Sequence, residues 1–469
     1  MSVAIAVDLG GSSGRVMKVT LQDRTLSLEQ VHRFDNVILE KGEGLYWDVD
    51  YLFSQIQEGL ALIDYQKGDS ISVDTWGVDY TLVDKNGKLL DIPHHYRDSR
   101  TEGYLASTLT KVEAKELYQQ TGLQFMEINT LFQLMSEKAL DEESTLLFIP
   151  DYFLYLLSGV KNTEMSIAST SQMLNPLTKD WNRDFLKTLK VKLPNLLNVS
   201  KSGKVLGPWV KHDSVSVISG CGHDTQAALV AVPAKEKDFL FLSSGTWSLL
   251  GTELDEPILT EEAFKANLTN EVGYGNKTAF LKNLIGLWVI QQLKAEWKIS
   301  FNEMEELAEK SDAFVAFLDL DDPLFVAPGP MEIRIQEYAR RTGQRVPQTR
   351  GEACRCVNES LALKYRLAKE QIEHCTNKKY ETLYIVGGGS KSPMLSQYTA
   401  NALKLNVVVG PVEATVCGNA LIQFLTRGEI ESITEARALI RQLPEIKSVE
   451  GKDFELWDKA FEDYKKIIK

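Results

Sequence analysis

Short apolar runs separated by glycine-rich turns and helical stretches predict an α/β protein. Residues 4–9 (AIAVDL) form a β-rich run, GGSSG is a turn, and RVMKVTL is a second β-rich run, so the chain is expected to open with an antiparallel hairpin. Phe53, Ile56, Leu60 and Ile63 recur at helical spacing. Further strands are expected at ISVDTW, TLLFIP, SVSVISG and LNVVVGP, the last three followed by helical sequence, and a hairpin turn is expected at Asn86-Gly87.

The opening hairpin pattern returns about halfway along the chain. Residues 238–253 read DFLFLSSGTWSLLGTE, which is again an apolar strand, a small-residue turn and a second apolar strand. Two copies at this offset suggest duplicated domains whose turns face each other across a cleft. The boundary is expected near VPAKEKD, at residues 234/235.

Length and charge narrow the class of protein. With 469 residues the chain exceeds the size of a single hydrophobic core, so two domains are expected. Lys plus Arg minus Asp plus Glu gives 52 − 65 = −13, which disfavours nucleic acid and anionic membrane as partners. No apolar run approaches the length of a membrane span or a signal-peptide core. A cytoplasmic enzyme of small molecules, monomeric or homodimeric, is therefore expected.

The cysteines favour packing roles over metal binding. Five cysteines are an odd number scattered over a long chain, which argues against a disulfide framework. Cys354 and Cys356 have the form of a CxC metal pair, but they have only His374 and Cys375 nearby, in or after the helical run that begins at Ser360. Structural zinc normally takes four ligands at recognisable spacing, so reduced, packed thiols are expected.

The two serine-rich turns suit a polyphosphate. GGSSG lacks the lysine of the GxxxxGK[ST] loop and the spacing of GxGxxG, so neither of those phosphate loops is present. Glycines let backbone N–H groups approach an anion, and hydroxyls add donors, which is what a triphosphate held by two turns requires. Asp8 at the end of the first strand is a candidate ligand of Mg²⁺; the alternative is that it caps the turn.

A third glycine loop follows a strand at residues 382–386. Gly387, Gly388 and Gly389 precede a helix for which Ser392 is the expected N-cap and Pro393 the first residue. A helix N-terminus after such a loop attracts anions, and bare glycines leave room for a base or ribose. The GxGxxG spacing of a dinucleotide site fails here, so mononucleotide binding is favoured.

Asp224 is the candidate catalytic base. The segment SVSVISGCGHDTQAALVAV runs from a strand through a glycine turn into a helix, with His223 and Asp224 at the helix start. Phosphoryl transfer to an alcohol uses an aspartate to accept the hydroxyl proton. The alternative is that Asp224 only caps the helix.

Two polar and aromatic clusters suit a polyol. The first is DTWGVDY, from Asp74 through Trp76 to Asp79, and the second is HHYRDSR, which includes His95 and Arg97. Such groups recognise vicinal hydroxyls, although each cluster read alone also suits a surface ion-pair network. The residues by themselves therefore lead to an ATP-dependent phosphotransferase acting on a small polyol.

These motifs together resemble the FGGY family of carbohydrate kinases, in the actin and hexokinase-like ATPase superfamily. AVDLGGSSGR is similar to the family's first phosphate motif, SSGTWSLLG to its second, VGGGSKSPMLSQYTAN to its adenosine motif and GPVEATVCGNA to its later connecting motif. The resemblance runs almost end to end. It implies an α/β fold of two duplicated actin-like, ribonuclease H-like domains with an interdomain cleft: residues 1–234 with the sugar site and first phosphate loop, and residues 235–469 with the nucleotide site and a C-terminal helical segment.

The resemblance also implies the chemistry and the residues. ATP with Mg²⁺ would phosphorylate the C1 hydroxyl of a ketose, with Asp224 as the base and Asp8 at the metal. The residues implied to bind ATP are Ser12, Ser13, Gly14, Arg15, Gly245, Thr246, Asn283, Gln291, Gly387, Gly388 and Gly389. The residues implied to bind the sugar are Gly77, Val78, Asp79, Arg97 and His223. The alternatives are a family kinase of a different ketose, a nonkinase ATPase of the superfamily, and a noncatalytic sugar sensor.

Overall fold

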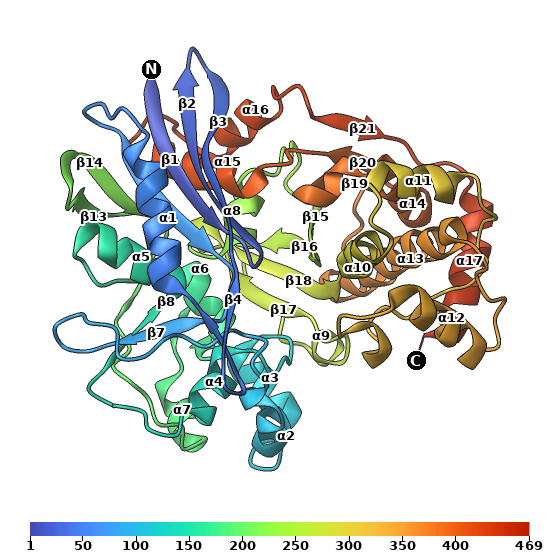
Figure 1. The fold of residues 1–469 in the computed structure, drawn as a ribbon, viewed down its shortest axis with the longest axis horizontal. Coiled ribbons are helices and arrows are strands. Elements are labelled where there is room, and N and C mark those ends of the chain that lie inside the picture. Colours follow the sequence, from blue (N-terminus) through green and yellow to red (C-terminus); the bar gives the residue numbers. More distant parts are fainter. Residues whose placement is uncertain (469) are drawn as a thin grey trace. The chain divides into compact units, whose positions relative to one another are not determined.

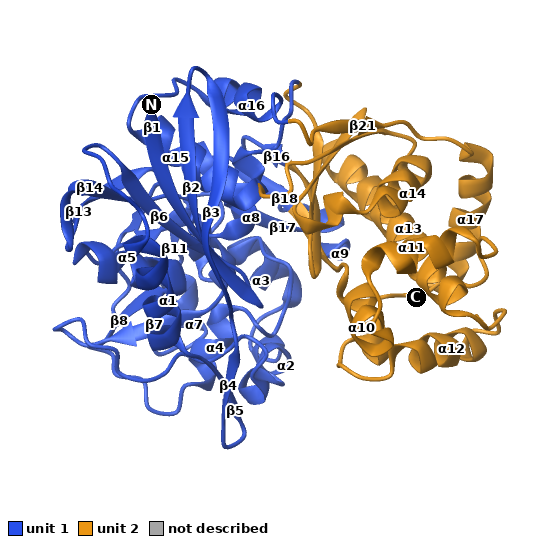
Figure 2. Ribbon diagram, turned by 45° about the horizontal axis from the view of Figure 1, so that its top comes forward, with its two compact units in different colours: residues 1–235, 253–280, 414–443 blue, residues 236–252, 281–413, 444–469 orange. Residues whose placement is uncertain are grey.

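The computed structural model describes residues 1–468, which divide by packing into two compact units. The first unit comprises residues 1–235, 253–280 and 414–443, and the second comprises residues 236–252, 281–413 and the chain from residue 444 onward (Figure 2). Each unit contains strands and helices of its own, and each is described separately below.

The first unit is built on a six-stranded sheet with the order β13-β14-β6-β1-β2-β3 (Figure 1). Its strands are β1 (Ser2–Leu9), β2 (Ser13–Gln22), β3 (Thr25–Asp35), β6 (Ser70–Thr75), β13 (Lys204–Trp209) and β14 (His212–Ser219). β1 and β2 form the predicted antiparallel hairpin, while β1 and β6 run parallel. The first hairpin therefore lies within the sheet, and the carboxyl end of β1 meets that of β6.

Shorter elements complete the first unit. Its remaining strands are β4 (Ile38–Lys41), β5 (Gly44–Trp47), β7 (Tyr80–Val83), β8 (Thr145–Phe148), β9 (Thr163–Glu164), β10 (Leu174–Asn175), β11 (Asp180–Trp181), β12 (Val199–Ser200) and β17 (Thr269–Val272). Its helices are α1 (Val49–Ala61), α2 (Tyr104–Leu109), α3 (Ala114–Thr121), α4 (Thr130–Ser136), α5 (Ile149–Ser158), α6 (Met165–Ala168), α7 (Arg183–Thr188), α8 (Asp224–Val230), α9 (Glu261–Lys265), α15 (Ala414–Thr426) and α16 (Ile433–Ile440). Single 3-10 turns lie at Ser99–Thr101, Ser169–Ser171 and Tyr274–Asn276.

Helix α1 shows why the sequence pattern predicted its position. Asp48 caps the helix by accepting a hydrogen bond from the Tyr51 N–H. Of the residues predicted at helical spacing, Ile56 and Leu60 are buried and Phe53 is partly buried. These side chains join one hydrophobic core with the alternate residues of β1 and β6. The helix ends at Ala61, so Ile63 packs into the core from beyond it.

Helix α15 packs closely against α8 and the sheet of the first unit (Figure 1). An added Cβ at Gly418 of α15 would lie 1.7 Å from the carbonyl oxygen of Ala227 in α8. Only glycine permits this approach. Because α8 begins at Asp224, the contact sets the position of the helix that carries the candidate base.

The second unit repeats the hairpin arrangement. Its strands belong to a sheet with the order β17-β18-β16-β15-β19-β20-β21, in which β15 pairs antiparallel with β16 and parallel with β19. The strands are β15 (Leu240–Ser244), β16 (Trp247–Leu254), β18 (Thr278–Ile285), β19 (Thr382–Val386), β20 (Asn406–Val409) and β21 (Lys447–Val449). The relation of β15 to its two neighbours matches that of β1 to β2 and β6, so the sequence repeat is a repeat of topology.

Helices surround the long α13 in the second unit. They are α10 (Trp288–Trp297), α11 (Phe301–Glu309), α12 (Met331–Arg341), α13 (Arg350–Thr376), α14 (Pro393–Leu403) and α17 (Phe454–Ile467), with 3-10 turns at Pro323–Phe325 and Gly388–Lys391. Cys354 and Cys356 lie inside α13, because the helix begins at Arg350 rather than at Ser360. Both thiols are buried, which raises the pKa of each to about 12. Packing thus accounts for the CxC pair.

Most predicted strands and caps are confirmed. β19 spans residues 382–386, and Ser392 caps α14 by accepting a hydrogen bond from the Leu395 N–H. The turn at Asn86-Gly87 also forms, but its second arm is reduced to a single bridge between Val83 and Leu89. β7 pairs instead with β8, and side chains of both strands are buried in the same hydrophobic core. Across residues 1–468, none of the helices combines the length and apolar character that crossing a membrane requires.

Replacement of Gly418 by alanine tests the helix crossing. Alanine favours a helix over glycine by about 1 kcal/mol, but here its Cβ meets a backbone carbonyl, and we expect a net loss of roughly 1–3 kcal/mol in the free energy of unfolding. Thermal and urea unfolding measure this loss. Gly388→Ala is the matched control, since a Cβ there meets nothing within 4 Å. A Gly418→Ala protein as stable as the parent would contradict the tight crossing.

Candidate active site

The parallel register of the first unit gathers acidic side chains at one sheet edge. Asp8 of β1 lies opposite Asp74 of β6, and a bridge between Thr75 and His223 brings the start of α8 to the same edge. Asp224 follows immediately. In open α/β sheets ligands bind outside the carboxyl ends of the strands, which is where these three carboxylates lie.

The first turn is held from behind. The Gly10 N–H donates to the Ser13 carbonyl at 2.9 Å, and the Asn36 side chain donates to the Gly10 carbonyl at 2.9 Å. Gly14 is required, because a Cβ there would lie 2.4 Å from the Phe34 ring. Ser12 is exposed and Ser13 is half-buried. The turn therefore presents two serines on a braced backbone.

Arg15 and Asp8 form an ion pair across the hairpin. Arg15 Nε and one terminal nitrogen donate to Asp8 Oδ2 at 2.9 and 2.6 Å. These residues are register partners in β1 and β2, so the pairing follows from the hairpin itself. Arg15, predicted to contact phosphate, thus also neutralises the predicted metal ligand.

Asp74 is the buried neighbour of Asp8. Its Oδ2 accepts a hydrogen bond from the Asn419 side chain at 2.6 Å, and its Oδ1 has no hydrogen-bond partner among residues 1–468. Burial, followed by repulsion from Asp8, raises the pKa of Asp74 well above its ordinary value. In the sequence Asp74 is grouped with the sugar-side residues, and the β1–β6 register additionally puts it beside Asp8.

Asp224 is the first residue of α8, and His223 occupies the N-cap position. Asp224 Oδ1 accepts a hydrogen bond from the Thr225 N–H at 2.6 Å, whereas Oδ2 has no donor within the described part of the chain. The side chain is 32% exposed. Partial burial and then the nearby Asp8 raise the pKa of Asp224, although His223 opposes the shift. Asp224 thus has one oxygen available to accept a proton.

Two buried glutamates brace the segment before Asp224. Glu164 Oε2 accepts a hydrogen bond from the Gly222 N–H at 2.9 Å, and Glu271 Oε2 lies 3.1 Å from His223 Nδ1. Burial alone lowers the pKa of His223, but the carboxylates around it, led by Glu271, raise it overall. Sequence reasoning missed both glutamates as functional residues. Glu271 ends the segment ANLTNE at residues 266–271, in which no catalytic or binding residue is predicted.

The predicted sugar segment is strained and firmly held. Val78 has φ = +70°, which is unusual for a β-branched residue and costs of order 1–3 kcal/mol. Its N–H donates to the Thr170 hydroxyl at 2.9 Å, and its carbonyl accepts from the Thr130 hydroxyl at 2.6 Å. A Cβ at Gly77 would lie 3.1 Å from Thr170. Such strain persists where surrounding contacts over-determine the backbone, as they do here.

Asp79 lies beneath this segment. Its side chain is fully buried, and its Oδ2 accepts hydrogen bonds from the indoles of Trp47 and Trp76 at 2.6 and 2.9 Å. Gln133 donates to Oδ1 at 2.8 Å. Burial is the main cause that raises the pKa of Asp79, to about 6. In this structure Asp79 therefore orients two stacked tryptophans, whose ring centroids are 3.9 Å apart, and presents no surface of its own to a ligand.

The second sequence cluster is partly buried. His95 stacks on Trp47 with ring centroids 4.0 Å apart, and burial lowers its pKa to about 3, so the imidazole is neutral. Arg97 is exposed and its guanidinium lies 5.7 Å from the centroid of the Tyr96 ring. The cluster is thus more than a surface ion-pair network, because its aromatic part is packed around Trp47.

The predicted nucleotide residues of the second unit gather around the second turn. Thr246 donates to Gln291 Oε1 at 3.1 Å, and the Gly245 N–H donates to the Trp247 carbonyl at 2.9 Å. Added Cβ atoms at Gly387 and Gly389 would lie 3.1 Å from the backbone oxygen and 1.9 Å from Oγ of Ser244, respectively. Gly388 between them is exposed, and Asn283 is half-buried on β18.

The acidic edge suits Mg²⁺ bound mainly by water and phosphate. No group of three or more His, Cys, Asp or Glu side chains within residues 1–468 forms a ready-made metal site. Mg²⁺ does not need one, because it takes one or two carboxylates and fills its octahedron with phosphate oxygens and water. Asp8, with the unpartnered Oδ1 of Asp74 on the neighbouring strand, fits that donor set.

Comparison with known proteins defines the class. The N-terminal domain of the FGGY family of carbohydrate kinases matches residues 3–231, and the C-terminal domain of that family matches residues 240–426. The chain therefore belongs to the FGGY family of carbohydrate kinases, and the predicted two-domain α/β fold is confirmed.

Several curated relatives of this chain are rhamnulokinases. The rhamnulokinase of Bacteroides thetaiotaomicron is 38% identical, with 99% of each chain covered, and that of Halalkalibacterium halodurans is 38% identical, with 97% of this chain and all of the relative covered. Solved structures agree on the fold. A xylulose kinase from Lactobacillus acidophilus superposes with a TM-score of 0.82 at 17% identity over 100% and 98% of the two chains. A Plasmodium falciparum glycerol kinase with ADP gives 0.81 at 16%, over 99% and 97%.

Replacement of Glu271 by glutamine tests the electrostatics at His223. The charge that most raises the pKa of His223 disappears, so we expect that pKa to fall. In the parent the folded pKa exceeds the unfolded value of about 6.5, so the pair stabilises the fold below that pH and the contribution disappears as pH rises through the folded pKa. In the Glu271→Gln protein, the free energy of unfolding should lack this loss as pH rises.

An NMR titration of the six histidines measures the pKa, with the His223 signal identified by its absence in His223→Gln. Glu256→Gln, at an exposed glutamate, is the control. An unchanged His223 pKa in Glu271→Gln would show that the pair does not control the imidazole.

Proposed function

We propose that this chain transfers the γ-phosphoryl group of ATP to the C1 hydroxyl of L-rhamnulose, giving L-rhamnulose 1-phosphate and ADP. Two observations support the substrate. Curated rhamnulokinases match almost the whole chain at 36–39% identity, and the clusters DTWGVDY and HHYRDSR pack their aromatic side chains around Trp47 in the first unit. The open Oδ2 of Asp224 is the observation that carries the mechanism.

Asp224 acts as the general base in this proposal. As the C1 oxygen forms its bond to the γ-phosphorus, Asp224 Oδ2 accepts the hydroxyl proton and the bond from phosphorus to the β,γ-bridging oxygen breaks, leaving ADP. The raised pKa of Asp224 makes it a stronger base than an ordinary aspartate. His223, held by Glu271, keeps the carboxylate oriented by lying 3.4 Å from its Oδ1.

The remaining site residues are assigned by unit. In the first unit Ser12, Ser13, Gly14 and Arg15 are proposed to contact phosphate, and Asp8 to hold Mg²⁺, which neutralises phosphate charge when bound. The sugar is proposed to meet Gly77, Val78, Arg97 and His223, with Asp79 acting through the tryptophans it orients.

In the second unit six small or polar residues are proposed to bind the rest of ATP, together with Asn283. They are Gly245, Thr246, Gln291, Gly387, Gly388 and Gly389. The contacts of Thr246 with Gln291 and of the glycine loop with Ser244 support a single nucleotide surface on this unit. We further propose that residues 1–234 and 235–469 are the two functional domains.

Replacement of Asp224 by asparagine tests the base. Asparagine keeps the shape but cannot accept the proton, so turnover should fall by roughly 10² to 10⁴ while the affinity for ATP stays near that of the parent. Coupled ADP release and titration calorimetry with ATP measure the two quantities. Asp213→Asn, at an exposed aspartate of β14, is the matched control. Turnover of Asp224→Asn close to that of the control would refute the assignment.

A substrate panel tests the sugar. ADP release with L-rhamnulose should greatly exceed that with L-fuculose, D-xylulose and glycerol, because a site that hydrogen-bonds one arrangement of hydroxyls rejects substrates that present another. A blank without sugar should be slow. Greater activity with L-fuculose would identify a fuculokinase instead. Equal ADP release with and without sugar would indicate a nonkinase ATPase.

A further inference from the structure

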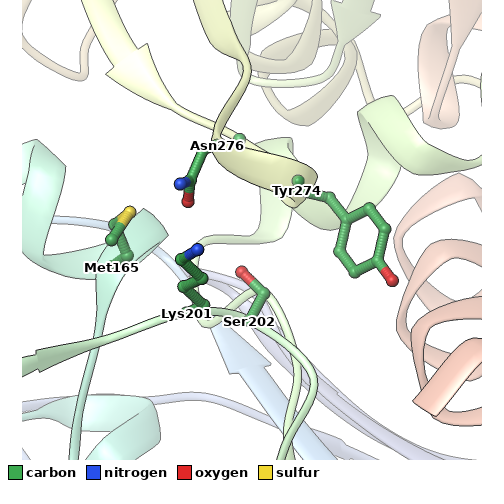
Figure 3. Close-up of a pocket in the computed structure, with 7 residues that line it drawn as sticks. Met165, Lys201, Ser202, Tyr274 and Asn276 are labelled. Atoms are coloured by element: carbon green, nitrogen blue, oxygen red, sulfur yellow. The ribbon is translucent and has the colours of Figure 1, made fainter. Parts of the chain in front are cut away.

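A small pocket in the first unit is lined by none of the residues proposed above to bind ATP or sugar. Met165 of α6, Lys201 and Ser202 after β12, and the turn 273–276 after β17 line it, and its volume is about 190 Å³ (Figure 3). Ligand sites for drug-sized molecules are about 300–1,000 Å³, so this pocket suits a smaller molecule than a nucleotide.

Two unpaired donors point into the pocket. The Lys201 ammonium and the Asn276 side-chain amide lie toward one another across it (Figure 3). Neither side chain has a hydrogen-bond or ion-pair partner in the described chain. An ammonium and an amide N–H₂ are donors suited to a phosphate group.

The turn that carries Asn276 is itself organised by positive charge. Lys179 Nζ donates to the Asn276 carbonyl, and Gly275 and Asn276 both adopt left-handed conformations, with φ of +67° and +63°. Asparagine tolerates this conformation, so the amide is aimed by the backbone. Lys201 is the one charged side chain that lines the pocket, and its ammonium favours an anionic occupant. Lys179 lies behind the turn, where the carboxylates of Asp255 and Glu256 act on it.

Ser202 offers the pocket a hydrogen-bond acceptor, in contrast to the donors of Lys201 and Asn276. Its hydroxyl donates to Glu164 Oε1 at 2.6 Å and accepts from the Cys221 thiol at 3.4 Å, so one lone pair of Oγ remains to accept a hydrogen bond. The carboxylate of Glu164 is fully engaged, because it also accepts from Ser166, Ile167 and Gly222. A ligand with a phosphate at one end and a hydroxyl at the other therefore meets a donor pair and an acceptor.

The pocket walls touch both braces of the catalytic segment. Ser202 bonds Glu164, which bonds the Gly222 N–H, and the turn 273–276 directly follows β17, which carries Glu271 beside His223. A ligand that shifts either wall changes the position of a carboxylate that holds the Gly222–Asp224 segment.

We propose that this pocket binds a small phosphate ester of a polyol, and that this binding changes the environment of the His223 imidazole. The proposal does not rest on the kinase activity, since it concerns other residues and is measured by binding. The phosphate is held by Lys201 and Asn276, and a hydroxyl of the ligand donates to Ser202.

Titration calorimetry with sn-glycerol 3-phosphate, inorganic phosphate and glycerol at matched ionic strength tests the site. Lys201→Met and Asn276→Asp should each weaken the binding of glycerol 3-phosphate about tenfold or more, since a charge-assisted hydrogen bond is lost or a repulsive charge added. The matched controls are Lys192→Met, at an exposed lysine, and Asn377→Asp, at an exposed asparagine with φ of +52°. Both controls should bind like the parent. Inorganic phosphate should bind more weakly than the ester, and glycerol weakest.

Equal affinity in the parent and in Lys201→Met and Asn276→Asp, or no binding of either phosphate, would overturn the site. The same holds if glycerol binds as tightly as its phosphate ester. Coupling is read from the His223 NMR signal, which should shift at a glycerol 3-phosphate concentration that saturates the parent, and should shift much less in Lys201→Met at that same concentration. Binding without any shift of that signal would overturn the coupling.

Discussion

The pairing of β1 with both β2 and β6 is the constraint on which the rest of the site depends. Parallel register places Asp74 beside Asp8, and antiparallel register places Arg15 opposite the same aspartate. Two buried carboxylates on neighbouring strands repel each other, so the edge is stable only with compensation. Arg15 supplies a positive charge to one and Asn419 a hydrogen bond to the other. A cation bound at this edge would relieve the remaining repulsion, which agrees with the proposed metal role of Asp8.

The segment that carries the proposed base is held by buried acids as well as by its own helix. The Gly222 N–H donates a hydrogen bond to Glu164, and the His223 ring lies between the carboxylates of Glu271 and Asp224. An acidic residue that acts as a base needs one free oxygen and a fixed position, and this arrangement provides both, because the neighbouring groups engage Oδ1 and leave Oδ2. The tight crossing of α8 and α15 at Gly418 fixes the same helix from its other side.

The sugar-side segment shows a different solution to positioning. Val78 is kept in an unfavourable backbone conformation by hydroxyls from Thr130 and Thr170, and Asp79 turns inward to orient Trp47 and Trp76. The strain at Val78 and the buried Asp79 both cost stability, and their presence in one short stretch agrees with the proposed sugar-binding role of that stretch. A surface ion-pair network would need neither.

The sequence by itself determined the elements, the repeated hairpin, the glycine turns, the caps at Asp48 and Ser392 and the identity of the candidate base, because each of these depends on a few neighbouring residues. The tertiary structure decided which of them meet. Asp74 lies beside Asp8 through sheet register, Asn419 reaches Asp74 across 345 residues, and Glu164 and Glu271 approach the catalytic segment from separate strands. Long-range packing also pairs β7 with β8 rather than with the residues that follow the Asn86-Gly87 turn. Local preferences carry no information about register or long-range burial, and those two properties assembled the site.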